Sequence, residues 1–94
     1  MDKELKEKWV AALRSGKYEQ YAPAIDGYRN ERSNKFCCLG VLAYCVLDVN
    51  KRQFSVRPTF LRHGLTGDVM SELISMNDTG KSFNEIADYI EAKL

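Results

Sequence analysis

An uncharged run of twelve residues, Phe36 to Leu47, constrains the fold of this chain more than any other segment. The neighbouring segments are amphipathic and charged, whereas this run is apolar on every side of a helix, with Gly40 in its interior. A segment that is apolar all round has to be enclosed by the rest of the molecule. Its leucine and alanine content favours a helix that begins near Cys37, although Phe36 to Cys38 would also suit a short strand. We therefore predict that the run is the buried core.

Amphipathic patterns on both sides of the run predict the helices that cover it. Asp2 suits the N-cap of a first helix that ends at Gly16. Thr66 suits the cap of a later helix, and Ser82 with Glu85 has the spacing of a capping box at the start of the last one. The apolar positions expected to face the core are Leu5, Trp9, Ala12, Leu13, Val69, Met70, Leu73, Ile74, Met76, Phe83, Ile86, Ala87, Ile90 and Leu94. Asn77 to Gly80 is predicted to be a tight turn that joins the last two helices in a hairpin.

The connections are less regular. Residues 17–35 mix turn formers with aromatic rings and predict a long ordered loop. Gln53 to Arg57 alternates polar with apolar residues and predicts a short strand, after which Pro58 begins a helical turn that ends before Gly64. We predict a mainly helical α+β fold, with a buried central helix packed by an N-terminal helix and a C-terminal helical hairpin, and a small β element. Residues 1–94 are long enough for a single domain.

Composition indicates the expected cellular compartment. The three cysteines are an odd number and two are adjacent, unlike the framework of a secreted disulfide scaffold, so a reducing cytoplasm is expected. The charged N-terminus does not resemble a signal peptide, and the apolar run is too short to cross a membrane. We therefore expect a cytoplasmic protein with no membrane partner.

Charge is unevenly distributed, although the formal net charge is only +1. Residues 29–65 carry seven basic and two acidic side chains, whereas residues 66–94 carry two basic and six acidic ones. The basic segment would suit phosphate groups. Duplex DNA is not the expected partner, because the basic excess is small and no recognition helix follows Leu94.

Three further patterns resemble functional sites without meeting their requirements. Cys37, Cys38 and Cys45 with His63 supply zinc-type ligands, but adjacent residues on a helix diverge, and core cysteines are the simpler interpretation. Residues 80–82, Gly-Lys-Ser, lack the upstream glycine of a phosphate-binding loop. His63 has no evident nucleophile partner. We expect no enzymatic activity, no metal and no cofactor.

Two sets of residues remain as candidate binding groups. Tyrosine and arginine dominate binding hot spots, and the long loop is rich in both. The predicted partner-binding residues are Tyr18, Gln20, Tyr21, Tyr28, Arg29 and Arg32. An alternative, in which the same rings cover the edge of the core, stays open. A second set could bind a phosphate-bearing ligand, and its members are Arg52, Arg57 and Arg62.

Three segments together resemble a family of small accessory proteins of tailed bacteriophages and prophages. They are residues 8–18, residues 36–42 with the sequence FCCLGVL, and residues 76–88 with the sequence MNDTGKSFNEIAD, which cover about a third of the chain. Residues 46–65 depart from the resemblance, since they lack a glycine-rich pattern. The resemblance implies a phage origin and carries over no activity.

Small phage accessory proteins often bind and disable host components, and this analogy raises that class of function. The leading hypothesis is a non-enzymatic phage accessory protein that binds and inhibits a bacterial host protein, such as an antiviral defence component. The alternative is a sponge that sequesters a nucleotide or nucleotide-derived signal in a basic pocket. The sequence does not specify the oligomeric state.

Overall fold

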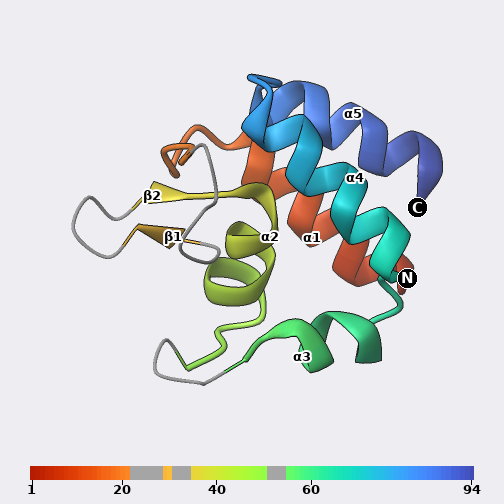
Figure 1. Ribbon diagram of the computed structural model, residues 1–94. Helices are drawn as coiled ribbons and strands as arrows, with labels where there is room; N and C mark the ends of the chain where they lie inside the picture. Colours follow the sequence, from red (N-terminus) through yellow and green to blue (C-terminus); the bar gives the residue numbers. More distant parts are fainter. Residues whose placement is uncertain (22–28, 31–34, 51–54) are drawn as a thin grey trace.

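The structure, a computed structural model, describes residues 1–21, 29–30, 35–50 and 55–94. It confirms a mainly helical fold (Figure 1). The helices are α1 (Lys3–Arg14), α2 (Cys38–Gly40), the π-helix η1 (Val41–Val46), α3 (Arg57–Arg62), α4 (Gly67–Asp78) and α5 (Phe83–Lys93). Two short strands, β1 (Arg29–Asn30) and β2 (Lys35–Phe36), pair antiparallel, with Arg29 opposite Phe36.

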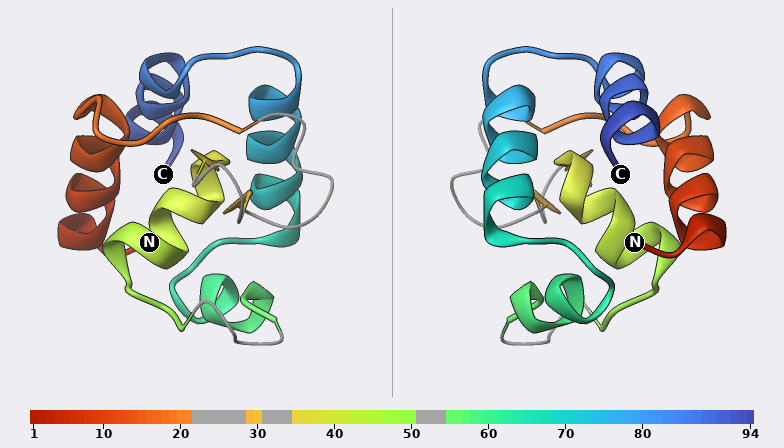
Figure 2. Two further views of the ribbon diagram at one scale, coloured as in Figure 1. Left: turned by 90° about the vertical axis from the view of Figure 1, so that its left-hand side faces the viewer. Right: turned by 90° about the vertical axis from the view of Figure 1, so that its right-hand side faces the viewer.

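The central segment formed by α2 and η1 lies between α1 on one side and α4 on the other (Figure 2). Residues 37–43 are buried, as the sequence predicts. Residues 44–47 are only partly buried, so the prediction that the whole apolar run is enclosed is wrong for its last third. The surrounding elements cover the start of the run, and its end reaches the surface beside α1.

The central helix also differs from the expected α-helix. Only Cys38–Gly40 is α-helical, and Val41–Val46 is a π-helix, in which each N–H bonds the carbonyl five residues earlier. The bond from Leu47 N to Leu42 O, at 2.9 Å, continues this pattern. Because the π-helix has more residues per turn, side chains spaced three, four or seven residues apart no longer lie on one face, as they would in an α-helix.

Helix α1 forms as its sequence predicts. The Asp2 carboxylate accepts a hydrogen bond from the Leu5 N–H at 2.9 Å, and Gly16, with φ of 75°, follows the end of the helix. Trp9 is fully buried, and its indole N–H donates to the carbonyl of Cys38 at 3.0 Å. This bond ties the first helix to the start of the central segment.

Helix α5 packs more extensively on α1 than on α4. Its buried face consists of Phe83, Ile86, Ala87 and Ile90, four of the residues predicted to face the core. The predicted capping box is confirmed, because the Ser82 side chain accepts from Glu85 N while the Glu85 carboxylate accepts from Ser82 N. The core is a single cluster of buried side chains drawn from both ends of the chain, from Trp9 to Ile90.

The connection between α4 and α5 begins two residues later than expected. Helix α4 starts after Thr66, as predicted, but continues through Asp78, so Asn77 is a helical residue and not part of a turn. Asn77 follows Met70 and Leu73 on one helical face, and that face is buried. The chain turns at residues 79–82, with Gly80 at φ of 96°.

The strand predicted at residues 53–57 is absent from the described part of that range. Residues 53–54 are outside the described part of the chain, residues 55–56 form no strand, and Arg57 opens α3. Pro58 sits in the first turn of that helix, where its fixed φ suits the helix and its missing N–H costs no hydrogen bond. The described strands lie instead at residues 29–30 and 35–36, at the end of the segment predicted to be a loop and the start of the apolar run.

Candidate functional site

Asn77 is the organising residue of the surface that carries the predicted partner-binding segment. Its side chain is fully buried and holds three hydrogen bonds to two other segments. The amide oxygen accepts from Gln20 Nε2 at 2.9 Å and from Cys38 N at 3.2 Å, and the amide nitrogen donates to the carbonyl of Tyr21 at 2.8 Å. Asn77 therefore holds the segment that follows α1 against the central helix.

The bond to Cys38 also caps α2. Cys37 is the N-cap residue of that helix and makes no side-chain cap hydrogen bond. The first N–H groups of a helix have no partner within the helix. Asn77 of α4, 39 residues along the chain, supplies an acceptor for the N–H of Cys38.

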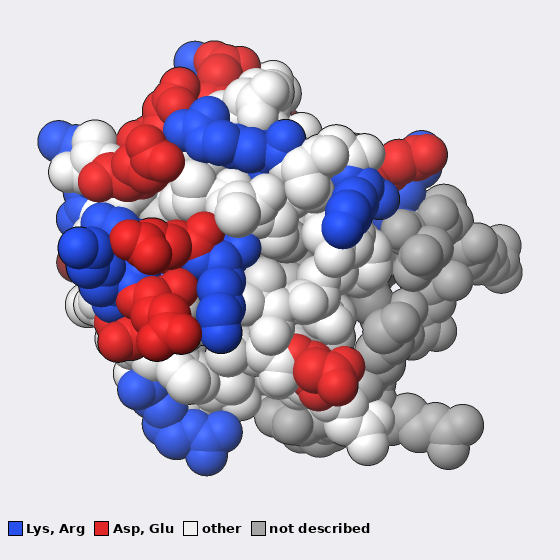
Figure 3. Space-filling model, turned by 180° about the vertical axis from the view of Figure 1, so that it is seen from behind, with Lys and Arg blue, Asp and Glu red and all other residues white. Residues whose placement is uncertain are grey.

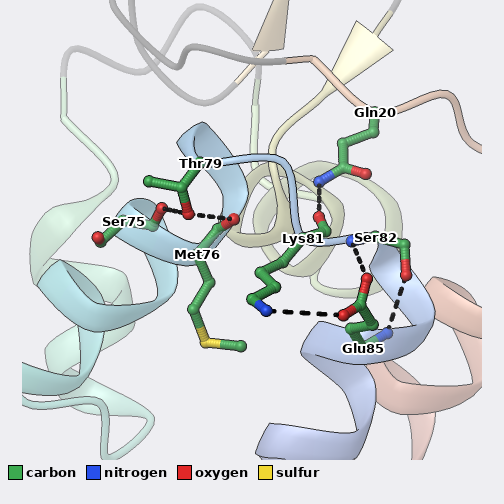
Figure 4. A network of polar contacts seen from close by, with 7 residues as sticks. All are labelled: Gln20, Ser75, Met76, Thr79, Lys81, Ser82 and Glu85. Carbon is green, nitrogen blue, oxygen red and sulfur yellow. Dashed lines mark hydrogen bonds and ion pairs between the residues drawn. The ribbon is translucent and has the colours of Figure 1, made fainter.

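Gln20 is one of the predicted partner-binding residues, but the structure gives it a role within the fold. In addition to its bond with Asn77, its Nε2 donates to the carbonyl of Lys81 at 2.7 Å (Figure 4). That carbonyl lies in the α4–α5 connection, next to the capping box of Ser82 and Glu85. Thr79 tightens the same connection by donating its hydroxyl to Ser75 O at 2.8 Å.

Tyr18 and Tyr21 are both half-buried. The ring of Tyr18 meets Phe36 edge-on, with centroids 5.9 Å apart and an interplanar angle of 86°. Tyr21 is held through its backbone, since its N–H donates to Phe36 O at 2.7 Å. The tyrosines thus partly cover the core edge, as the alternative interpretation requires, and partly remain accessible for contact.

Two hollows flank the segment that carries Tyr18. The first, which we call the α1–η1 groove, has a volume of about 390 Å³. Its lining among the described residues consists of Lys8, Ala11, Ala12, Ser15, Lys17, Tyr18, Cys45 and Val46.

The second, the α1–α5 hollow, has a volume of about 250 Å³ and is lined by Leu13, Arg14, Gly16, Tyr18, Gln20, Ser82, Phe83 and Asn84. Among the described residues, Tyr18 alone lines both hollows.

Charge on the α1–α5 side is locally balanced. Arg14 forms ion pairs with Asp88 and Glu91 of α5, and the hydrogen bond with Asp88 is the main cause that raises the pKa of the guanidinium. From behind, basic and acidic side chains alternate over one part of the surface, and uncharged surface extends beside them (Figure 3). The α1–α5 hollow therefore has its cation already engaged.

The remaining candidate arginines are not brought together in the described residues. Tyr28, Arg32 and Arg52 lie outside them, and of Arg29 only the backbone pairing in β1 is described. Arg57 and Arg62 are exposed on α3.

Arg57 and Arg62 each contact a different neighbouring residue. Arg57 extends over Gly67, where a Cβ added to the glycine would lie 3.1 Å from the Arg57 Nη2, and Arg62 donates to the Thr59 hydroxyl at 3.2 Å. Neither arginine lines either hollow.

The cysteine side chains divide into two kinds. Cys37 and Cys38 are fully buried, and burial raises the pKa of the Cys37 thiol to about 11 and that of Cys38 well above its usual range. The Cys38 thiol lies 3.6 Å from the carbonyl of Leu73. Cys45 is partly exposed and lines the α1–η1 groove. Among the described residues no three His, Cys, Asp or Glu side chains cluster as metal ligands do.

Sequence reasoning names Tyr18 as a candidate but indicates neither the core position of Asn77 nor the groove. Asn77 reads as part of a turn because Asn, Asp, Thr and Gly are turn formers. Its spacing of four from Leu73 and seven from Met70 is the signal that places it on the buried face. The groove cannot be recognised from the sequence, because its two walls, α1 and η1, are far apart along the chain. In addition, the π-helix changes which side chains of η1 face α1.

The fold and its hollows define a small helical domain with a surface groove beside a fixed aromatic segment. The chain belongs to the family described as a domain of unknown function, DUF8296, whose family model matches residues 1–64. The searches of curated proteins and of solved structures found no match. Within the described part of the chain, no helix combines the length and hydropathy needed to span a bilayer.

Proposed function

We propose that this protein is a non-enzymatic binding module that recognises and inhibits a bacterial host protein. The setting is the host cytoplasm, in line with the phage accessory proteins that the sequence resembles. The observation that carries the proposal is the placement of Tyr18, which lies between two surface hollows in a segment held by partly buried hydrogen bonds to Asn77. Aromatic side chains that are held in place before binding lose little entropy on association.

Two of the three thiols are poorly suited to nucleophilic catalysis, in line with a binding role. A nucleophilic cysteine needs a lowered pKa and access to substrate, whereas Cys37 and Cys38 have raised pKa values and no exposure. The α1–η1 groove is lined by groups suited to contact, among them tyrosine, lysine and small apolar side chains.

The test is affinity capture from bacterial extract with the full chain immobilised. We expect one dominant polypeptide at near-stoichiometric yield, and loss of that polypeptide with Tyr21→Ala. The backbone bonds of Tyr21 would survive this change, so the variant should unfold at nearly the same temperature as the parent. Tyr89→Ala is the matched control, because Tyr89 is also half-buried but lies on α5 and not in the segment that follows α1.

Two results would contradict the proposal. One is capture of no specific polypeptide. The other is a rise in melting temperature with a nucleoside phosphate in the absence of any captured protein, which would support the sponge alternative, since a ligand that binds only the folded state stabilises it.

A further inference from the structure

We infer that the α1–η1 groove binds an acidic peptide segment of the partner protein. This inference rests on the proposed function and specifies the partner's chemistry. The groove runs beside α1, where Lys8, Ala11, Ala12 and Ser15 recur at helical spacing on one outward strip. The opposite wall is the end of η1.

The charge of the groove selects an anionic occupant. Two of its eight described lining residues are lysines and none is acidic. Lys17 forms no ion pair with any described residue, while Lys8 lies 3.8 Å from Glu4, with both side chains mostly exposed. An exposed pair of this kind contributes about 0.2–1 kcal/mol, so a carboxylate arriving in the groove can displace Glu4.

The backbone that carries Lys17 is fixed. The Ser15 hydroxyl donates to Ala12 O at 2.7 Å and accepts from Lys17 N at 3.2 Å, and Gly16 adopts φ of 75° between them. Lys17 therefore leaves the end of α1 in a set direction, next to Tyr18. Its ammonium can meet a carboxylate without first ordering the main chain.

Between the two lysines the surface is small and mostly apolar. Ala11 and Ala12 let another chain approach α1 closely, and Val46 and Cys45 form the facing wall. A volume of about 390 Å³ is enough for a few side chains. A peptide with carboxylates at both ends of an apolar residue matches this order of cation, apolar floor and cation.

The π-helix explains why the facing wall exists. Cys38 and Cys45 are seven residues apart and would share a face in a regular α-helix. Cys38 is fully buried, whereas Cys45 is partly exposed in the groove. The wider turns of η1 thus bring the end of the apolar run out to the surface beside α1.

The direct test uses two fluorescein-labelled pentapeptides, Glu-Glu-Leu-Glu-Glu and Gln-Gln-Leu-Gln-Gln, with binding to the full chain followed by anisotropy. We expect the glutamate peptide to bind in low salt and the glutamine peptide to bind much more weakly. Lys17→Glu should weaken binding by roughly threefold or more. Lys93→Glu, which makes the same charge change on α5 outside the groove, should not.

A steric pair of variants separates the groove from general charge attraction. Ala11→Trp fills the groove from an exposed helical position, and Ala92→Trp makes the same change at an exposed position of α5. Only the first should abolish peptide binding. Equal binding of the two peptides, or binding that survives both Ala11→Trp and Lys17→Glu, would overturn the inference.

The same variants distinguish failure of this inference from failure of the proposed function. If the captured host protein is retained by Ala11→Trp and Lys17→Glu but lost with Tyr21→Ala, the binding function stands and the groove assignment is wrong. If the glutamate peptide competes with the captured protein for the parent chain, both are supported. If no protein is captured, the proposed function fails first.

Discussion

Replacing Asn77 with alanine should cost far more stability than a typical asparagine substitution. The change removes an acceptor for the Cys38 N–H and for the Gln20 amide, and a donor for the Tyr21 carbonyl. Because Asn77 is fully buried, water cannot readily replace these partners. The first N–H of α2 would lose its cap, and residues 20–21 would lose their attachment to α4.

The magnitude follows from the three bonds. A hydrogen bond within a protein contributes about 1 kcal/mol net, and a buried group left without a partner costs about 1–3 kcal/mol. Three lost bonds therefore predict a decrease of about 3 kcal/mol in the free energy of unfolding. For a domain of this size, such a loss lowers the melting temperature by more than about 10 °C.

Urea unfolding followed by tryptophan fluorescence is a suitable assay, because Trp9 is the single tryptophan and is fully buried. Asn84→Ala is the matched control, since Asn84 is exposed on α5 and the change should stay within about 0.5 kcal/mol. A double-mutant cycle between Asn77→Ala and Gln20→Ala should show coupling, because the two side chains share a hydrogen bond. An Asn77→Ala variant as stable as the control would refute this account of the buried amide.

Four other perturbations have expected outcomes. Iodoacetamide at about pH 8 should modify the native protein once, at Cys45, whereas Cys37 and Cys38 should react only in denaturant. Mass spectrometry of peptides detects the modified residues. Rapid modification of Cys37 in the native protein would contradict its burial. Ser82→Ala should cost about 1 kcal/mol in urea unfolding. The hydrogen bond from Ser82 N–H is the main cause that lowers the pKa of the Glu85 carboxyl from 4.5. The stability contributed by ionised Glu85 is therefore complete above pH 4.5 and is lost as the pH falls through the lowered pKa. Glu85→Gln should flatten that part of the pH–stability profile. Gly64→Ala should destabilise by about 2 kcal/mol in thermal unfolding, since φ is 90° and the new Cβ would lie 3.2 Å from the backbone of the first residue.

Local signals predict the helices of this protein well. The caps at Asp2, Thr66 and Ser82 form as expected, because a cap depends on a side chain and an N–H only three residues away. Pro58 and Gly64 likewise mark the start and end of α3. These features need no knowledge of the tertiary fold.

Features that depend on distant partners are not predictable in the same way. Asn77 has turn-forming chemistry, and only the presence of Cys38 and residues 20–21 at α4 makes it a core residue. The β1–β2 pair joins two-residue strands, too short to produce an alternating pattern. Nor does the composition of Val41–Val46 distinguish a π-helix from an α-helix. The groove inherits this difficulty, because its position depends on that π-helix.

The DUF8296 match covers the proposed groove but not the helices that support it. All eight described residues of the α1–η1 groove lie within the matched residues 1–64. The groups that hold this region in place lie beyond it, since α5 packs on α1 and Asn77 of α4 fixes residues 20–21 and the start of α2. The proposed recognition surface and its support are therefore encoded in different parts of the sequence. A family member that uses the same groove needs a counterpart to α4 and α5, because without them the apolar face of α1 that carries Trp9 and Leu13 would lose the cover that α5 provides.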